Sequence, residues 1–284
     1  MTKLGERATE VPIEERRPGA AAQSRTDQLA VEEPLEIRLV FGPKETRESR
    51  SLAITMRTPG DDLALAAGFL LGEGVVRDPR EIEQLEHCGP VVEGRTTSNI
   101  VKVELAPNVT LDLPSLERNF YTTSSCGICG KASLDAVELS GIKPLPATDW
   151  KLSEEALYAL APQLGEQQQI FAATGGLHAA GWFDHRGRIL SVHEDVGRHN
   201  AMDKLIGLQF RSGRLPLNNS GILLSGRASF ELAQKALMAG VPMVVAVGAP
   251  SSLAVEVAQR FGMTLVGFVS AERFNVYAGA ERIA

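Results

Sequence analysis

The sequence predicts an α/β fold, with a layered parallel-sheet domain at the C-terminal end and a smaller α+β lobe before it. The main observation is an alternation of apolar strands with helices: strands at 221–225, 242–248 and 264–269 enclose helices at 230–240 and 252–262. Continuously apolar strands joined through helices pair in parallel, with right-handed crossovers. Length is the second observation, because 284 residues at roughly 100–200 residues per domain predict two domains or lobes.

The rest of the C-terminal domain, expected over 119–284, continues this alternation. A helix is predicted over 151–164, with Ser153 as its N-cap. Strand-like segments at 170–184 and 188–195 meet at the turn of sequence HRGR. The spacing of apolar residues then predicts a helix over 196–210, capped by Asp195.

The N-terminal lobe is expected over 29–118. Alternating apolar residues predict strands at 33–41, 50–58 and 99–105, of which the first two suit a hairpin. The segment 58–74 reads as a helix that Asp61 or Asp62 caps. Residues 1–28 mix arginine and glutamate with little apolar periodicity, so we expect a disordered tail there.

Charge and composition exclude several classes of function. A net charge of -6 argues against a broad nucleic-acid-binding surface. The longest apolar run, 63–71, is too short to span a membrane, and the N-terminus lacks the apolar core of a signal peptide. Three cysteines are too few for a disulfide framework. We therefore expect reduced thiols and a cytoplasmic protein.

Three turns at the carboxyl ends of the predicted parallel strands indicate an anion site. They are 225–229, 248–252 and 270–273, and they contain Arg227 and Arg273. Ligands of open α/β sheets bind at this edge, and helix N-termini there favour phosphate. The alternative is that the serines are helix caps and the glycines only form turns. No GxGxxG or Walker motif is present.

A run of ionisable residues at 191–204 is the second candidate site. It contains His193, Glu194, Asp195, Arg198, His199 and Asp203. So many charges at one strand-to-helix junction suit general acid–base chemistry. For each residue alone, a structural role in caps and ion pairs is the favoured explanation, whereas for the run as a whole we favour a site. His178, after a glycine pair, is a weak signal and reads more simply as a core histidine.

The segment TSSCGICGKAS, residues 123–133, contains Cys126 and Cys129, each followed by glycine. Lys131 and a helix predicted behind this loop would lower a thiol pKa and favour the thiolate. A thiolate attacks sulfur, so the loop suits persulfide or disulfide chemistry. A zinc site is the rival interpretation, with further ligands from the histidines or Cys88. The order of the His and Cys motifs is the reverse of that in zinc deaminases, and we expect no permanent metal.

Five segments in this order resemble the FdhD family, the sulfur carriers required for formate dehydrogenase maturation. They are SSCGICGKASLDAV, TGGLHAAGWFD, VHEDVGRHNAMDKLIG, SGRASFELAQKA and GFVSAERFNVYAG. The likeness covers roughly residues 30 to 284 and leaves the tail unmatched. It also implies that the C-terminal domain has a three-layer, cytidine-deaminase-like fold without the zinc of those enzymes.

The resemblance implies a sulfurtransferase that takes sulfur from a cysteine desulfurase as a persulfide. Cys126 would carry the sulfur and Cys129 would assist. The sulfur would pass to the molybdenum or tungsten of a bis(molybdopterin guanine dinucleotide) cofactor, delivered to apo formate dehydrogenase. The family's cofactor contact falls on six residues here: Phe268, Val269, Ser270, Ala271, Glu272 and Arg273. The resemblance also implies that the protein is a homodimer.

Three hypotheses follow. The first is the sulfur carrier that loads a persulfide on Cys126. The second is a cofactor-binding chaperone whose thiols transfer no sulfur. The third is a zinc-dependent enzyme acting on a nucleobase.

Overall fold

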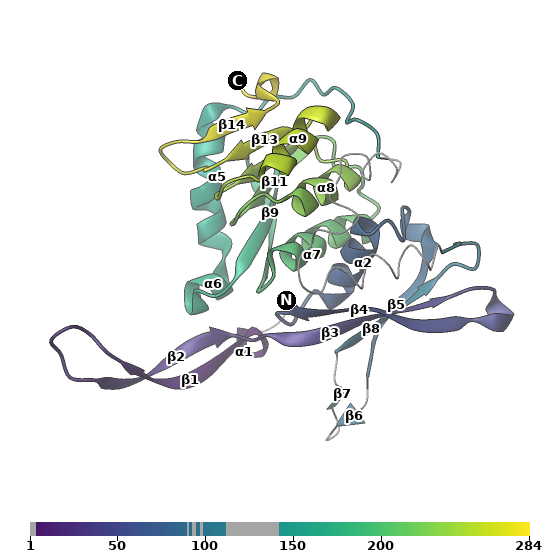
Figure 1. Cartoon of the computed structure of the whole chain (residues 1–284), viewed down its shortest axis with the longest axis horizontal. Coiled ribbons are helices and arrows are strands. Elements are labelled where there is room, and N and C mark those ends of the chain that lie inside the picture. The colour runs from purple at the N-terminus through teal and green to yellow at the C-terminus, as the bar shows by residue number, and fades with distance from the viewer. Residues whose placement is uncertain (1–3, 90, 93–94, 97–98, 112–141) are drawn as a thin grey trace.

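A computed structural model describes residues 4–89, 91–92, 95–96, 99–111 and 142–284 (Figure 1). Helices in this part are α1 (Leu4–Arg7), α2 (Asp62–Gly72), α5 (Glu154–Gln167), α6 (Gln169–Thr174), α7 (Arg198–Arg211), α8 (Phe230–Met238) and α9 (Ser252–Phe261). The strands are β1 (Ala8–Glu15), β2 (Gln23–Ala30), β3 (Glu33–Phe41), β4 (Glu48–Arg57), β5 (Ile82–Cys88), β6 (Val91–Val92), β7 (Arg95–Thr96), β8 (Ile100–Leu105), β9 (His178–Asp184), β10 (Ile189–Asp195), β11 (Ser220–Leu224), β12 (Met243–Ala246), β13 (Thr264–Gly267) and β14 (Asn275–Ala278).

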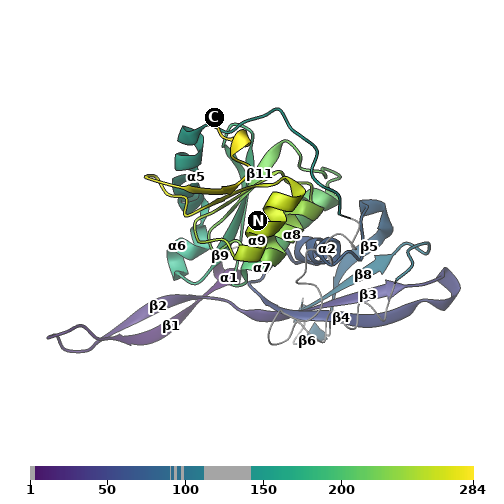
Figure 2. The ribbon, with the colours of Figure 1, turned by 45° about the horizontal axis from the view of Figure 1, so that its top comes forward.

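The C-terminal part is built on a six-stranded sheet of order β10-β9-β11-β12-β13-β14. Its centre, β11, β12 and β13, is parallel, which confirms the pairing predicted from the apolar strands. Alternate residues of these strands point to opposite faces: Ile222 and Val244 belong to the core under α7, α8 and α9, and Leu223 and Val245 to the core under α5. Two helical layers therefore enclose one sheet, as Figure 2 shows. The likeness to cytidine deaminases stays a prediction.

The N-terminal lobe is a four-stranded sheet of order β4-β3-β8-β5 that packs on α2. β3 and β4 form the predicted antiparallel hairpin. On the inner face, Leu35, Ile37 and Leu39 are almost completely buried. Helix α2 is apolar on nearly every side because it lies between this sheet and α7.

Glycines allow α2 and α7 to approach closely. A Cβ on Gly207 would collide with the carbonyl oxygen of Ala64, and a Cβ on Gly68 with that of Asp203. The two lobes consequently share one apolar core, which runs from β3 and β8 through α2 and α7 to β11. The expected domain boundary between residues 118 and 119 lies outside the described residues and stays a prediction.

The expectation of a disordered N-terminal tail is wrong for residues 4–28. β1 and β2 pair over eight residues each and extend from the body as a ribbon. Its base is anchored by Arg7, whose guanidinium donates to the carbonyl oxygen of Glu194 over 2.9 Å, and by packing of β2 against α6. An isolated two-stranded hairpin is marginal in water. Because these anchors lie more than 130 residues away, the local sequence gives no sign of them.

Two local predictions in the C-terminal part also fail. The segment 170–184 begins as helix α6 and becomes strand only at His178. The Glu194 carboxylate explains the helix, since it accepts hydrogen bonds from the backbone N–H groups of Ile170 and Phe171. Asp195 does not cap α7, whose N-cap is Gly197. By contrast, Ser153 caps α5 as predicted.

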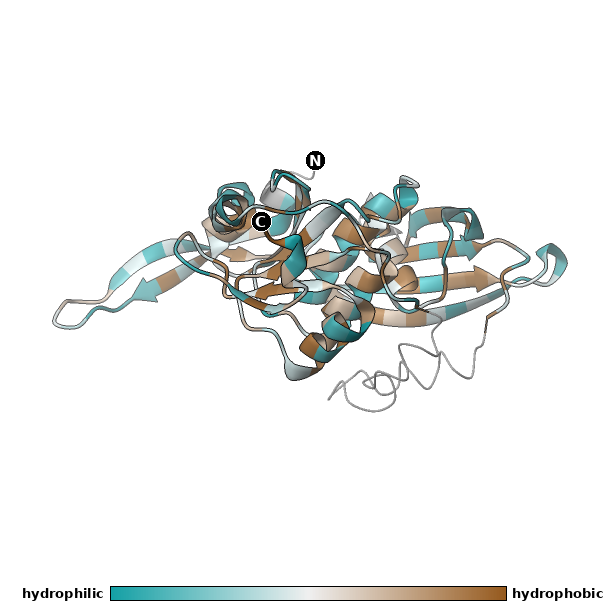
Figure 3. Ribbon diagram, turned by 90° about the horizontal axis from the view of Figure 1, so that it is seen from above, coloured by the Kyte–Doolittle hydropathy of each residue, from teal (hydrophilic) through white to brown (hydrophobic). Residues whose placement is uncertain are grey.

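Apolar residues are concentrated in the two main sheets and in the helices packed between them, whereas the β1–β2 ribbon is largely hydrophilic, as Figure 3 shows. Within the described ranges, no helix is long and apolar enough to cross a membrane.

Candidate functional site

The turns after β11, β12 and β13 lie side by side at the carboxyl edge of the large sheet. Gly248 N–H donates to the carbonyl of Gly226 over 2.9 Å, and Phe268 N–H donates to the carbonyl of Gly248 over 3.2 Å. A Cβ at position 248 would lie 2.9 Å from the backbone nitrogen of Arg227. A glycine is therefore required for these turns to pack together. We call the residues 225–229, 247–252 and 268–273 the strand-end rim.

Phe268 and Arg273 come together on this rim. Phe268 has a φ of 54°, which is rare for a residue with a bulky side chain, and the residue is 36% exposed. The Arg273 guanidinium lies 5.9 Å from the ring centroid, a cation–π geometry. The Ser270 hydroxyl closes the turn by accepting hydrogen bonds from the backbone N–H groups of Glu272 and Arg273.

Only part of the predicted segment 268–273 is therefore accessible to a ligand. Val269 is buried in the core at 1% exposure, and Ser270 shapes the turn. Ala271, Glu272 and Arg273 are exposed. Arg227, on the neighbouring turn, is also exposed. An aromatic face and two arginines therefore meet solvent at the edge where ligands of α/β sheets bind.

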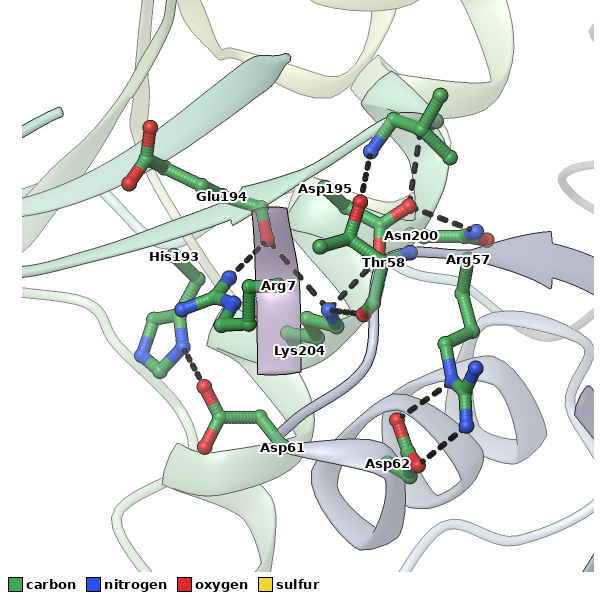
Figure 4. Close-up of polar contacts among 12 residues, drawn as sticks. Arg7, Arg57, Thr58, Asp61, Asp62, His193, Glu194, Asp195, Asn200 and Lys204 are labelled. Atoms are coloured by element: carbon green, nitrogen blue, oxygen red, sulfur yellow. Dashed lines mark hydrogen bonds and ion pairs between the residues drawn. The ribbon is translucent and has the colours of Figure 1, made fainter. Parts of the chain in front are cut away.

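The run 191–204 lies instead at the junction of the two lobes, as the close-up in Figure 4 shows. Asp195 and Lys204 form an ion pair of 2.7 Å, and both side chains are completely buried. Lys204 also donates to the carbonyl of Thr58 over 2.7 Å, and the N–H of Thr58 donates to Asp195 over 3.2 Å. Burial lowers the pKa of Lys204, and the charge of Asp195 opposes that shift. These bonds join β10 and α7 to the chain segment that follows β4.

Two further ion pairs extend this network. Arg57 binds Asp62 through two hydrogen bonds of 3.0 Å, and Lys235 binds Asp203 at 2.7 Å. Both pairs are buried. Arg57 and Asp62 join β4 to α2 within the N-terminal lobe, and Asp203 and Lys235 join α7 to α8 within the C-terminal part. Since a buried charge without a partner is strongly unfavourable, each pair stabilises the lobe that contains it. The prediction of a chemical site in the whole run 191–204 is therefore not supported for Glu194, Asp195 or Asp203.

His193 has a different partner. Its Nδ1 lies 3.2 Å from Oδ2 of Asp61, and Asp61 has a φ of 57°, in the left-handed region. The hydrogen bond with His193 lowers the pKa of the Asp61 carboxyl below its usual range, although partial burial opposes this. Sequence reasoning assigned Asp61 to a helix cap and missed this pair, which joins residues 132 positions apart.

His178, Arg198 and His199 lie close to one another near the strand-end rim. Burial first, and then the positive charges of Arg198 and His199, lower the pKa of His178. Nε2 of His199 lies 3.4 Å from the Ser229 hydroxyl and 3.9 Å from the Glu231 carboxylate. His178 is half-buried and lies near the charged side chains of Arg198 and His199. It is therefore not a histidine enclosed in the apolar core, as the sequence suggested.

Cys126 and Cys129 lie outside the described residues, as does Lys131. Cys88 is a half-buried free thiol on β5. In the part of the chain that is described, no group of three or more His, Cys, Asp or Glu side chains is arranged to hold a metal ion.

The fold and the rim define a class of protein: a three-layer α/β protein with an arginine- and aromatic-bearing edge suited to an anionic ligand. The chain belongs to the FdhD/NarQ family, whose model matches residues 30–284. It is 53% identical over 266 residues to the sulfur carrier protein FdhD of Streptomyces coelicolor, covering 93% of this chain and 92% of that one.

A second relative, the sulfur carrier protein FdhD of Mycobacterium tuberculosis, is 50% identical over 267 residues, with 92% of this chain and 93% of the relative covered. Among solved structures, the chain is similar to a formate dehydrogenase accessory protein from Desulfotalea psychrophila. The TM-score is 0.74 at 26% sequence identity, and the match covers 98% of this chain and 100% of the other.

Proposed function

We propose that this protein is a sulfur carrier for formate dehydrogenase maturation, with Cys126 as the carrier. The observation that carries the proposal is the near full-length likeness to relatives named sulfur carrier proteins, together with the C-G-I-C-G sequence motif at 126–130. The likeness to a formate dehydrogenase accessory protein supports the same role.

In the first step, the Cys126 thiolate attacks the terminal sulfur of a persulfide on a cysteine desulfurase. The sulfur–sulfur bond of the donor breaks, the desulfurase cysteine leaves as a thiolate, and a persulfide forms on Cys126. Transfer of that sulfur onward as sulfide takes two electrons. Either the Cys129 thiolate supplies them by forming a disulfide with Cys126, or the acceptor metal does.

The acceptor is the molybdenum or tungsten of a bis(molybdopterin guanine dinucleotide) cofactor, which the protein binds as substrate. The exposed Phe268 and Arg273 and the neighbouring Arg227 fit the phosphates and a ring of such a ligand. Apo formate dehydrogenase is the recipient. The proposal also includes a homodimer in the cytoplasm.

A cofactor chaperone that transfers no sulfur is the second candidate. The strand-end rim favours it, because binding of the cofactor there would need no thiol chemistry. A zinc-dependent nucleobase enzyme is the third. It gains nothing from the described residues, which contain no metal-binding cluster.

Peptide mass spectrometry tests the carrier role. The reduced protein is incubated with a cysteine desulfurase and cysteine, and the peptides are mapped. We expect one added sulfur on the peptide that contains Cys126 and Cys129, its loss in Cys126→Ala, and its retention in the matched control Cys88→Ala. No added sulfur beside an active desulfurase control would favour the chaperone.

A further inference from the structure

A cavity of about 550 Å³ opens in the C-terminal part, and helix α6 forms one of its walls. The other walls come from α5, the glycine turn that follows α6, and the segments that follow β11 and β12. The lining residues are Ala161, Leu164, Gln168, Phe171, Gly175, Gly176, Leu177, His178, Ser225 and Val247. A displacement of α6 would therefore change access to the cavity.

Helix α6 is short and is bounded by a possible hinge at each end. It has six residues, whereas an isolated helix is marginal below roughly 12–15 residues. Before it, Gln168 leaves the helical conformation with a ψ of 71°. After it, Gly175 has a φ of 68°, and a Cβ there would meet no atom within 4 Å. Positions of this kind absorb the backbone rotations of lids, so contacts from elsewhere must hold α6 in place.

Glu194 provides the main contact of this kind. Its side chain is almost fully buried, and its carboxylate accepts hydrogen bonds from the backbone N–H groups of Ile170 and Phe171 over 3.1 and 2.8 Å. The backbone carbonyl of the same residue accepts from the Arg7 guanidinium over 2.9 Å. Figure 4 shows that the carbonyl points to Arg7 while the carboxylate points away from it. A single residue thus joins α6 to the base of the N-terminal ribbon.

The base of the ribbon, Arg7 with Ala30 and Val31, also touches the far end of α6. Strand β2 packs against α6, and the Cβ of Ala30 lies 3.7 Å from the position that a Cβ on Gly176 would take. The carbonyl of Arg7 accepts from the N–H of Val31 over 2.9 Å, which closes the base. The ribbon base therefore contacts both the capped start of α6 and the glycine turn after it.

The Arg7 anchor is held at an energetic cost. Its Nε is buried without a hydrogen-bond partner among the described residues, which is unfavourable for a donor. Lys204 donates to the same Glu194 carbonyl over 3.4 Å. Burial mainly, and the positive charge of Arg7 in addition, lowers the pKa of Lys204, so the two cations repel each other. The nearby Asp61 carboxylate offsets part of this repulsion. An anchor with these costs is one that can be released.

We propose that the ribbon base is a strap that keeps α6 closed as a lid over the cavity. While Arg7 holds the carbonyl of Glu194, the carboxylate of this residue stays under the start of α6. Release of Arg7 frees both contacts, and α6 opens about Gln168 and Gly175. The ribbon and the cavity are thereby coupled, and the coupling acts in both directions. It is independent of the sulfur-carrier role and of the molecule that enters the cavity.

Hydrogen exchange of the full chain, followed by mass spectrometry, tests the strap. Arg7→Ala removes the anchor, and Arg16→Ala, at an exposed ion pair of the ribbon, is the matched control. We expect the amides of α6 to exchange at least about tenfold faster in Arg7→Ala. Those of α8, on the other face of the sheet, should not change. Arg7→Lys keeps one donor for the carbonyl and should stay closer to the wild type.

Access to the cavity is measured with a single thiol, in a chain whose Cys88, Cys126 and Cys129 are replaced by serine. Leu177→Cys places the thiol in the cavity wall, at a residue 5% exposed, and Leu237→Cys on α8, at a residue 4% exposed, is the control. Arg7→Ala should speed the reaction of N-ethylmaleimide at position 177 at least about tenfold. The rate at position 237 should not change.

Wild-type exchange of α6 in Arg7→Ala would overturn the strap. Equal acceleration in α6 and α8 would also overturn it, because a general loss of stability would then explain the change. Faster exchange of α6 without faster labelling at position 177 would show that α6 loosens without opening the cavity, and would overturn the lid. If the serine-substituted chain fails to fold, as circular dichroism would report, hydrogen exchange of Arg7→Ala decides alone, because it needs no cysteine replacement.

Discussion

The junction between the lobes and the strand-end rim both contain several charged side chains. At the junction these side chains are buried and paired, whereas on the rim they are exposed or lack a partner among the described residues. At the junction, Asp195 and Lys204 are completely buried and paired at 2.7 Å. On the rim, Arg227 and Arg273 are exposed, and Nε of Arg198 nearby is buried without a partner. Charges that are buried and satisfied hold parts of a protein together, whereas exposed or unsatisfied ones are available to a ligand.

This difference shows why the density of ionisable residues in the sequence is an incomplete guide to chemistry. The run 191–204 contributes Asp195 and Asp203 to buried ion pairs, while Arg198 and His199 lie near the rim. Asp195 ends β10, and Asp203 lies one turn beyond His199 on the same face of α7. The position of each residue along the chain, and not the face of the helix, therefore decides which neighbours it meets.

The largest effect is expected from Asp195→Ala, which leaves Lys204 charged and buried without its carboxylate. Breaking a buried ion pair costs about 3–5 kcal/mol of unfolding free energy. Urea unfolding followed by circular dichroism measures the loss. The control is Arg16→Ala, which removes an exposed pair with Glu14 and should be neutral. Equal midpoints for the two variants would contradict the structural role of the junction.

Gly207→Ala tests the same junction through packing. The added methyl group would collide with the carbonyl oxygen of Ala64, so α7 must move away from α2. We expect a loss of about 3 kcal/mol, at the upper end for overpacking. Gly165→Ala in α5 meets no atom within 4 Å and should instead stabilise the protein by roughly 0.5–1 kcal/mol. Similar changes in both variants would refute the close helix contact.

On the rim, Arg273→Ala should separate binding from stability. A lost hydrogen bond to a charged ligand corresponds to at least about a tenfold weaker affinity for GDP. Unfolding free energy should fall by less than about 1 kcal/mol, since an exposed cation–π contact is small. The control is Arg186→Ala, in the β9–β10 turn at the opposite edge of the sheet. A large loss of stability with unchanged GDP affinity would show that Arg273 stabilises the fold and does not bind the ligand.

The smallest effect concerns Glu231 at acidic pH. Its interaction with His199, followed by the bond from Ser229, lowers its pKa to about 2, although burial opposes the shift. The unfolded chain, with a pKa of 4.5, binds the proton more tightly, so this contribution to stability is present above pH 4.5 and is lost towards pH 2.

Glu231→Gln should therefore show a weaker loss of stability between pH 4.5 and pH 3 than the wild type, in urea unfolding at each pH. The control is Glu272→Gln, at an exposed position of the rim, which should follow the wild-type profile. Parallel profiles for Glu231→Gln and the wild type would show that this carboxylate does not make the contact.

Short-range features of the fold were predictable from the sequence. The apolar strands β11, β12 and β13 and the N-cap serine Ser153 follow from local pattern and are present. Each depends on neighbours within a few residues, so the sequence around it contains the full cause.

Features that depend on distant partners were not predictable. The β1–β2 ribbon needs the bond from Arg7 to Glu194, and helix α6 needs the carboxylate of the same residue. The Asp61–His193 pair and the positive φ of Phe268 have no local signature. Tertiary contacts set all four, and no pattern of nearby residues encodes them.

Transfer of labelled sulfur tests the central claim most directly. The wild-type protein and Cys126→Ala are loaded with radioactive sulfur by a cysteine desulfurase, freed of small molecules, and mixed with the cofactor and apo formate dehydrogenase. The account predicts that label moves from the wild-type protein to the cofactor as formate dehydrogenase activity appears, and that Cys126→Ala gives neither. Full activity with Cys126→Ala, or activity without labelled cofactor, would contradict it.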